Sequence, residues 1–284
     1  MMHRTDAERR FRSTPTVLTD MMLGIVALAT RAERIDIGAA TLDVDRRGRG
    51  APIVFFDAGA LSGLAGWDAI WDRLPDTVTA IRYSRRGEGD STACSGQLTA
   101  TDYAQDAERL LGRLGITEPI VYVSHSYGSA VARAFAARHP DRIAAMLFVD
   151  PINPRDVEIL TEVDPENGPA EIASIRQNDL TMATEQGWCF IDDVWAKEPS
   201  PGFDAIGDIP ITVIAGVRRV EEPETLFHTD HARRRWGEIQ AEWVEPFPRG
   251  KAVLTEDSGH FVQDDEPDLV VRELASLLDR MDSH

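Results

Sequence analysis

The order of hydrophobic and polar positions predicts two kinds of strand. Between Ile35 and Val44 hydrophobic residues alternate with polar ones around Gly38, which predicts an antiparallel hairpin at a sheet edge. Farther along the chain, short hydrophobic runs show no alternation, as is typical of strands buried on both faces. These runs are 53–56, 78–83, 120–123, 146–149, 211–215 and 252–254. They are candidates for a parallel sheet.

Helical patterns occupy the segments between these runs. In 103–114 and 269–278 the hydrophobic residues share one helical face. Strands and helices alternate, which predicts an α/β fold with a doubly wound, mostly parallel sheet and right-handed crossovers. The segment 153–207 is polar, rich in Pro and Gly and too long for an ordinary crossover, so we expect a helical cap insertion. The predicted plan is an N-terminal helical extension at 1–34, a core at 35–152 and 208–284, and a cap at 153–207.

The composition of the chain argues against binding to nucleic acids or anionic membranes and against lysine-based catalysis. The 284 residues are 43% hydrophobic, enough for one large core. The chain has 30 basic and 48 acidic residues, and its formal charge of -18 disfavours nucleic acid and anionic membranes as partners. A small-molecule substrate is the expected partner, and the oligomeric state stays open. Lys197 and Lys251 are the only lysines and lie in no recognisable motif, so lysine-based catalysis is set aside.

The N-terminus allows two interpretations. Basic residues between positions 9 and 12 precede a hydrophobic stretch at 21–29, loosely like a signal peptide. Acidic residues in the same region and the shortness of the stretch favour an amphipathic helix and a cytoplasmic protein. No other segment is long and hydrophobic enough to predict a membrane span.

The cysteines and histidines do not predict a metal site. Cys94 and Cys189 are far apart and lack metal-binding or CxxC spacing, so we expect isolated thiols. His228 and His231, with Asp230 between them, could face one side of a helix, but no further ligand follows. A surface position is the better interpretation of this group. We expect no metal and no cofactor.

The strongest chemical motif follows the hydrophobic run 120–123. It reads Ser124-His125-Ser126-Tyr127-Gly128 and leads into a helix of small residues. A sharp strand-to-helix turn that exposes a serine needs small residues on both sides, and Ser124 takes the place of the usual first glycine. The amides at such a helix start favour a developing oxyanion. Ser126 is therefore the candidate nucleophile.

A histidine near the C-terminus is the candidate general base for Ser126. Gly259-His260 follows the last predicted strand and precedes a helix that begins at Pro267. A serine hydroxyl is a poor nucleophile at neutral pH unless a histidine takes its proton and a carboxylate orients that histidine. The order Ser126, acid, His260 is the one found in strand-turn-helix serine hydrolases.

Together these motifs resemble the α/β-hydrolase superfamily over about residues 35–278. The resemblance implies an oxyanion loop at 55–60, with the backbone N–H groups of Ala60 and Tyr127 as donors. It also identifies 83–91 as the family's architectural turn, with Ser84 replacing an aspartate. A serine at the nucleophile position argues against epoxide hydrolase and haloalkane dehalogenase chemistry, which in this family proceeds through an aspartate.

The catalytic acid is less obvious, because the usual position after the run 211–215 holds Arg218 and Arg219. Glu221 and Glu222 come slightly later but suit an exposed turn before Pro223. Asp150, directly after the run 146–149, matches a subset of the superfamily that carries its acid there. We predict Asp150, with a turn or helix cap as the alternative role.

The expected reaction is acyl transfer to water through an acyl-serine. An ester or lactone of a small, largely apolar substrate is the default. Amide, thioester or carbon–carbon bond hydrolysis and cofactor-free perhydrolysis are alternatives on the same residues, and a receptor-like ligand-binding protein is an alternative of another class. Trp188 and Trp195 are predicted either to line the substrate pocket or to pack the cap onto the core.

Overall fold

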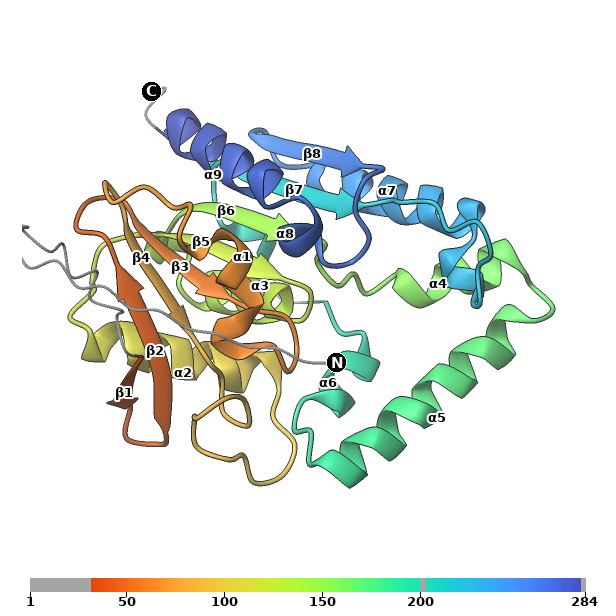
Figure 1. Ribbon diagram of the computed structural model, residues 1–284, viewed down its shortest axis with the longest axis horizontal. Coiled ribbons are helices and arrows are strands. Elements are labelled where there is room, and N and C mark those ends of the chain that lie inside the picture. Colours follow the sequence, from red (N-terminus) through yellow and green to blue (C-terminus); the bar gives the residue numbers. More distant parts are fainter. Residues whose placement is uncertain (1–31, 200–202, 282–284) are drawn as a thin grey trace, which may run out of the picture.

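The chain folds around one eight-stranded sheet (Figure 1). The computed structural model describes residues 32–199 and 203–281, so most of the predicted N-terminal extension lies outside the described residues. The strand order is β1-β2-β4-β3-β5-β6-β7-β8, antiparallel at β1-β2 and β2-β4 and parallel from β4 onward. The strands are β1 (Glu33–Asp36), β2 (Thr41–Arg47), β3 (Ile53–Asp57), β4 (Thr79–Tyr83), β5 (Ile120–His125), β6 (Ile143–Val149), β7 (Ile211–Gly216) and β8 (Gly250–Thr255).

Helices cover both faces of this sheet, which explains its uninterrupted hydrophobic strands. The side chains of α1 and α9 pack in one hydrophobic cluster, and those of α2 and α3 pack in a second cluster on the opposite face. No helix in the described part of the chain is both long and apolar enough to cross a membrane. The helices are α1 (Asp68–Trp71), α2 (Ala100–Arg113), α3 (Gly128–Arg138), α4 (Asp156–Val163), α5 (Gly168–Gln186), α6 (Ile191–Ala196), α7 (Asp230–Val244), α8 (Val262–Asp265) and α9 (Pro267–Met281).

The predicted fold class is confirmed, and every predicted strand is present. The edge hairpin pairs Ile35 with Leu42 and turns at Gly38, whose φ of 87° suits glycine. Strands β3, β5 and β7 are buried along their whole length. The alternating segment thus forms the antiparallel edge of the sheet, and the uninterrupted hydrophobic runs form its buried parallel centre, as predicted.

The described part of the segment between β6 and β7 is mainly helical, and it packs on the core through Phe190 and Phe203. It contains α4, α5 and α6, and Figure 1 shows α5 running beyond the carboxyl ends of the strands. Most of α5 is exposed, with Ala183 and Gly168 as its buried residues. We refer to residues 153–207 as the insertion.

The expectation of isolated thiols is wrong, because the structure joins Cys94 and Cys189 in a disulfide with Cα atoms 6.4 Å apart. The end of α5 lies against the loop that follows β4. In this contact the Leu98 N–H donates to the Cys189 carbonyl (2.5 Å) and the Gln97 side chain donates to the Trp188 carbonyl (3.1 Å). A separation of 95 residues hides this proximity from spacing rules. The disulfide links the insertion to the core.

A buried charge network lies beneath the loop after β3. Arg85 is 2% exposed and forms ion pairs with Asp57 and with Glu88, the latter at 2.7 Å. Tyr83 and Tyr122 donate their hydroxyls to the same Asp57 oxygen at 2.8 and 2.9 Å. Burial raises the pKa of Asp57, whereas Arg85 and the two tyrosines oppose that rise. The network compensates charges that would be costly to bury alone.

We expect Arg85→Met to lower the free energy of unfolding by about 3 to 5 kcal/mol, because it leaves two buried carboxylates without their cation. Urea denaturation measures this. The control is Arg73→Met, which removes an exposed pair with Asp268 and is expected to cost less than about 1 kcal/mol. Equal stability of Arg85→Met and the wild type would contradict the role given to this network.

Candidate active site

Ser126 lies at the turn between β5 and α3. Its φ is 47°, a left-handed conformation that is rare for a residue other than glycine and typical of a strained nucleophile turn. A Cβ at Gly128 would lie 2.4 Å from the Asp57 carbonyl oxygen, so the start of α3 requires glycine there. Ser124 is fully buried, and the small side chain at this position fits the close strand-to-helix approach.

The structure brings the three predicted residues together in one chain of hydrogen bonds. The His260 Nε2 lies 3.0 Å from the Ser126 Oγ, and its Nδ1 lies 2.6 Å from Asp150 Oδ2. A carboxylate only accepts, so Nδ1 carries the proton and Nε2 is free to accept from the serine hydroxyl. This is the arrangement that general-base activation of a serine requires.

Asp150 is held from three directions. It is 1% exposed, and its Oδ1 accepts the Gly216 N–H at 2.9 Å and the Trp236 indole N–H at 2.8 Å. These donors leave Oδ2 for His260. Trp236 was not predicted as a site residue, because only its place on the hydrophobic face of α7 distinguishes it in the sequence.

The alternative acids lie elsewhere. Glu221 and Glu222 are exposed, and within the described chain neither forms a hydrogen bond to His260. Gly216 occupies the end of β7, where a Cβ would lie 1.9 Å from the Gly259 carbonyl oxygen. The end of β7 therefore contributes a backbone donor and close packing against the His260 loop, while the carboxylate comes from the end of β6.

His125 supports the loop of His260. It is 1% exposed, and its Nε2 donates to the His260 carbonyl oxygen at 2.9 Å. The Gln263 side chain approaches its Nδ1 at 3.4 Å. Burial and the nearby His260 lower the pKa of His125 to about 3, so its ring is neutral at physiological pH. In the sequence, only its place in the motif around Ser126 distinguishes His125.

The loop that carries the predicted oxyanion donor Ala60 lies beside Ser126, and the other predicted donor, Tyr127, follows Ser126 in the chain. A Cβ at Gly59 would lie 3.3 Å from the Ser126 Cβ, so this loop directly contacts the serine. Arg85 donates to the Gly59 carbonyl at 2.8 Å, and the N–H of Ala60 points the opposite way in a trans peptide. Within residues 32–199 and 203–281, the N–H groups of Ala60 and Tyr127 have no hydrogen-bond acceptor.

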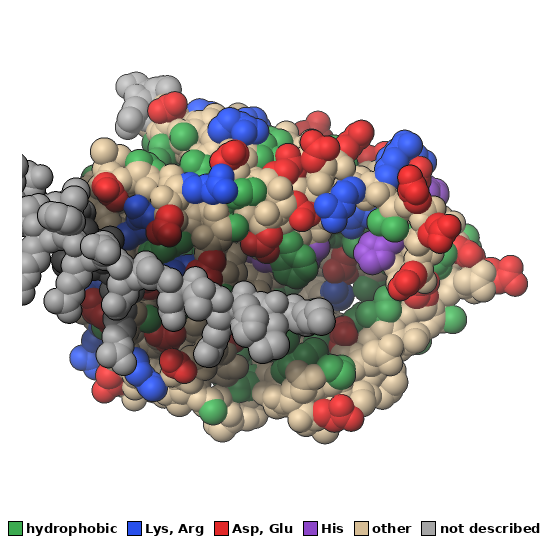
Figure 2. Space-filling view, in the orientation of Figure 1, with side chains coloured by type: hydrophobic (Ala, Val, Ile, Leu, Met, Phe, Trp, Pro, Cys, Tyr) green, Lys and Arg blue, Asp and Glu red, His purple; other side chains and the backbone are tan. Residues whose placement is uncertain are grey.

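A cavity of about 660 Å³ opens onto Ser126 and His260. The insertion supplies one wall, and Figure 2 shows a hollow on this side where hydrophobic side chains and a histidine are visible among acidic residues. Trp195 lines the cavity and donates its indole N–H to Asp179 at 2.9 Å. The other lining residues of hydrophobic type are Ile152, Val157, Leu160, Ile172, Ile175, Val194, Val220, Phe227, Trp236 and Phe261.

Trp188 does not line this cavity. Its ring stacks on Phe190, with centroids 6.0 Å apart, and Phe190 packs in turn on Tyr127. This corresponds to the packing alternative, since Trp188 packs against the hydrophobic cluster that contains Phe190 and Tyr127. His228 does line the cavity, where its Nδ1 lies 3.0 Å from the Thr225 hydroxyl, whereas His231 is exposed.

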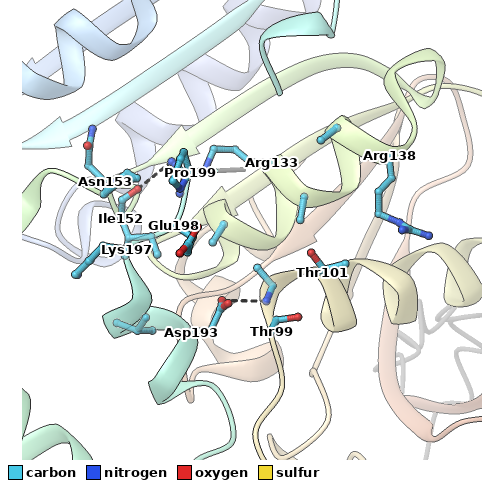
Figure 3. Close-up of a pocket in the computed structure, with 16 residues that line it drawn as sticks. Thr99, Thr101, Arg133, Arg138, Ile152, Asn153, Asp193, Lys197, Glu198 and Pro199 are labelled. Carbon is cyan, nitrogen blue, oxygen red and sulfur yellow. Dashed lines mark hydrogen bonds between the residues drawn. The ribbon is translucent and has the colours of Figure 1, made fainter. Parts of the chain in front are cut away.

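A second, smaller cavity of about 280 Å³ lies between α3, α6 and the start of α2 (Figure 3). In it Arg133 donates to the Ile152 carbonyl at 3.2 Å, and Asp193 accepts the Ala100 N–H at 2.9 Å. Ile152, Val194 and Lys197 line both cavities. None of Ser126, Asp150 and His260 lines this one.

The fold and this site define the class of the protein. The model of the alpha/beta hydrolase family matches residues 44–273, and the chain belongs to that family. It is 33% identical over 131 residues to 2-(acetamidomethylene)succinate hydrolase of Mesorhizobium japonicum, a match that covers 46% of each chain. It is 31% identical over 161 residues to a bifunctional esterase/perhydrolase of Acinetobacter calcoaceticus, covering 56% of each. The chain thus spans about half the length of these curated relatives.

Solved structures agree on the fold. The enol-lactonase of Burkholderia xenovorans superposes with a TM-score of 0.59 at 17% identity, covering 87% of this chain and all of that one (100%). An esterase of Thermogutta terrifontis gives 0.58 at 20% identity, covering 85% and 94%. At these identities the likeness establishes the fold, and the reaction must be argued from the site.

The pKa of His125 predicts a pH dependence of stability. The unfolded chain protonates this histidine below its ordinary pKa of about 6.5, whereas the folded protein resists protonation down to about 3. The stabilisation is therefore complete above the unfolded pKa and is lost as pH falls toward the folded one. His125→Gln keeps a donor but does not titrate. We expect the stability advantage of the wild type over this variant to shrink by about 1.4 kcal/mol per pH unit in this window.

Urea denaturation of both proteins at a series of pH values measures the difference. His231→Gln, at an exposed position on α7, is the control and should follow the wild-type pH profile. A constant difference between wild type and His125→Gln across the window would show that His125 is not held neutral.

Proposed function

We propose that this protein is a serine hydrolase that cleaves a carboxylic ester or lactone through an acyl-serine intermediate. The observation that carries the proposal is the continuous hydrogen-bond path from the Ser126 hydroxyl through His260 to the buried Asp150. Membership in the alpha/beta hydrolase family supports hydrolysis as the reaction class. A receptor-like protein with little turnover would not need Ser126, His260 and Asp150 to be joined by hydrogen bonds.

In the proposed reaction, Ser126 attacks the acyl carbonyl as His260 Nε2 takes its proton. The imidazolium is stabilised by Asp150, whose Oδ2 already accepts from Nδ1. The N–H groups of Ala60 and Tyr127 bind the oxyanion, and His260 then protonates the leaving alkoxide. Water attacks the acyl-serine by the same steps in reverse, and the free acid leaves.

The shape of the site favours an ester or lactone with a largely apolar body. Hydrophobic side chains from the insertion and from the loop after β7 dominate the cavity wall. We propose that the insertion acts as a cap, because α4, α5 and α6 all supply lining residues while the core supplies Ser126 and His260. An ester or lactone also requires the least activation from the site. The relative named an esterase/perhydrolase makes hydrogen peroxide a second acyl acceptor to test beside water.

A fluorophosphonate probe should label the protein once, at Ser126, because this hydroxyl is paired with His260, which a buried carboxylate orients in turn. Ser126→Ala should abolish both labelling and the hydrolysis of p-nitrophenyl esters. Ser124→Ala is a matched control, since Ser124 is buried two residues away and its hydroxyl has no partner among the described residues. Peptide mapping by mass spectrometry locates the adduct. An adduct elsewhere, or full activity in Ser126→Ala, would overturn the assignment.

Asp150→Asn should lower kcat by on the order of 10³ to 10⁴ while the fold persists. The Gly216 and Trp236 donors would hold the amide oxygen, which turns the amide N–H₂ toward His260. Nδ1 would then have to accept, and the proton would move to Nε2, where it blocks general-base action. Glu221→Gln, as control, should stay within about tenfold of wild type. The reverse ranking in steady-state assays, with circular dichroism as a folding check, would place the acid in the later loop.

A further inference from the structure

Arg233 is a buried cation in the wall of the proposed active-site cavity. It lies in the first turns of α7, is 5% exposed and lines the same cavity as Ser126 and His260. One guanidinium N–H₂ group donates to the Gly216 carbonyl, and the guanidinium carbon lies 5.3 Å from the centre of the Phe227 ring. In the described parts of the chain, its remaining N–H groups have no acceptor, and no carboxylate forms an ion pair with it.

The other charged residues in the cavity wall have partners. Lys197 pairs with Asp156 at 2.9 Å, Arg218 pairs with Asp265 at 2.9 Å, and Asp150 pairs with His260. Asp179 accepts the Trp195 indole N–H on the side of the cavity formed by α5 and α6. Arg233 is thus the buried cation of this wall whose hydrogen-bonding capacity is left for a ligand. A ligand anion would be repelled by Asp179 and drawn toward α7.

The contacts of Arg233 within the protein compensate only partly for the burial of its charge. Arg233 lies near the amino end of α7, where the helix dipole disfavours positive charge. Burial lowers its pKa, and the attraction of Asp150 only partly offsets this effect. The protein as a whole carries a formal charge of -18, so a local cation favours the binding of an anionic ligand that the overall charge would repel. Arginine is suited to a carboxylate, because its planar fork donates two parallel hydrogen bonds.

We propose that Arg233 binds a carboxylate on the substrate, so that the natural substrate is an ester or lactone that carries a free acid group away from the bond that is cleaved. This inference rests on the proposed hydrolase function and narrows its substrate class. The apolar wall would contact the body of the substrate, and Arg233 would fix the acidic end. Arg233 is therefore a specificity-determining residue rather than a participant in proton transfer.

The test compares substrates that differ only in a terminal carboxylate. The p-nitrophenyl monoesters of succinate, glutarate and adipate are measured beside the p-nitrophenyl esters of butanoate, pentanoate and hexanoate, with the spontaneous hydrolysis of each subtracted. We expect wild type to prefer the acid ester at one or more chain lengths. Arg233→Gln should lower kcat/KM for that acid ester by about 10- to 100-fold, mainly through KM, and leave the neutral ester within about threefold. Arg233→Lys, which keeps the charge, should restore part of the preference.

Arg234→Gln is the matched control, since it removes the same charge from the next, exposed position of α7. A wild type that hydrolyses neutral esters but shows no preference for an acid ester at any length would overturn the inference. An equal loss of kcat on both substrate types in Arg233→Gln would also overturn it and make Arg233 a positioning residue for Gly216 and Asp150.

Failure of the proposed function is recognised separately. If wild type hydrolyses none of these esters, binding to the Ser126→Ala protein is measured by isothermal titration calorimetry with the same ester pairs. Tighter binding of the acid ester, lost on adding Arg233→Gln, supports the carboxylate site independently of turnover. Equal binding of both members of every pair refutes it.

Discussion

The organisation of the site depends on the satisfaction of one buried carboxylate. Asp150 has almost no contact with water, so each of its oxygens must find donors within the protein. Gly216 at the end of β7 and Trp236 on α7 supply two of them, and His260 after β8 supplies the third. The same three bonds that neutralise the cost of burying Asp150 fix the distance and tautomer of the histidine. Both the stability of the fold and the proposed chemistry therefore require the three hydrogen bonds to Asp150.

The loop after β3 is held by a buried cation, in the way that the His260 loop is held by the buried carboxylate of Asp150. Arg85 is buried and must be surrounded by acceptors, which it finds in Asp57, Glu88 and the carbonyls of Ala58 and Gly59. Because the Gly59 carbonyl points toward Arg85, the N–H of Ala60 in the same trans peptide points away from it. The turn that sequence analysis interpreted as architectural therefore supports the loop predicted to bind the oxyanion. One hydrogen bond thus has two effects: it satisfies the buried Arg85 guanidinium, and it fixes the orientation of the Gly59–Ala60 peptide group.

The parts that could be predicted from sequence are those encoded locally. Buried runs and helical periodicities identified the sheet, and the residues around Ser126 identified the turn, because strand, turn and helix are set by neighbours in the chain. Asp150 was predicted because Arg218 and Arg219 occupy the commoner acid position and because its place directly after the run 146–149 resembles a subset of the superfamily that carries its acid there. By contrast, the pairing of Cys94 with Cys189 depends on contacts between distant segments.

The supporting roles of His125 and Trp236 depend on such contacts too. His125 acts on the His260 loop through a bond across 135 residues, and Trp236 reaches Asp150 across 86. The packing of Phe190 on Tyr127 likewise joins segments that are far apart in the sequence. No local pattern encodes contacts of this kind.

The division between core and insertion has a consequence for how such a protein can diverge. The hydrogen-bond path, the buried arginine network and the strained Ser126 turn all belong to the core. Within the path and within the network, each group depends on its hydrogen-bond partners, so a change in one group affects those partners. The insertion contributes mostly apolar side chains, and α5 is largely exposed. Substitutions of these apolar lining residues alter the cavity wall without removing a hydrogen-bond partner of Ser126, His260 or Asp150. Arg233 lies at the boundary, since it contacts the Gly216 carbonyl of the core while it faces the cavity. A change in substrate charge must therefore preserve a donor for Gly216, whereas a change in substrate shape does not.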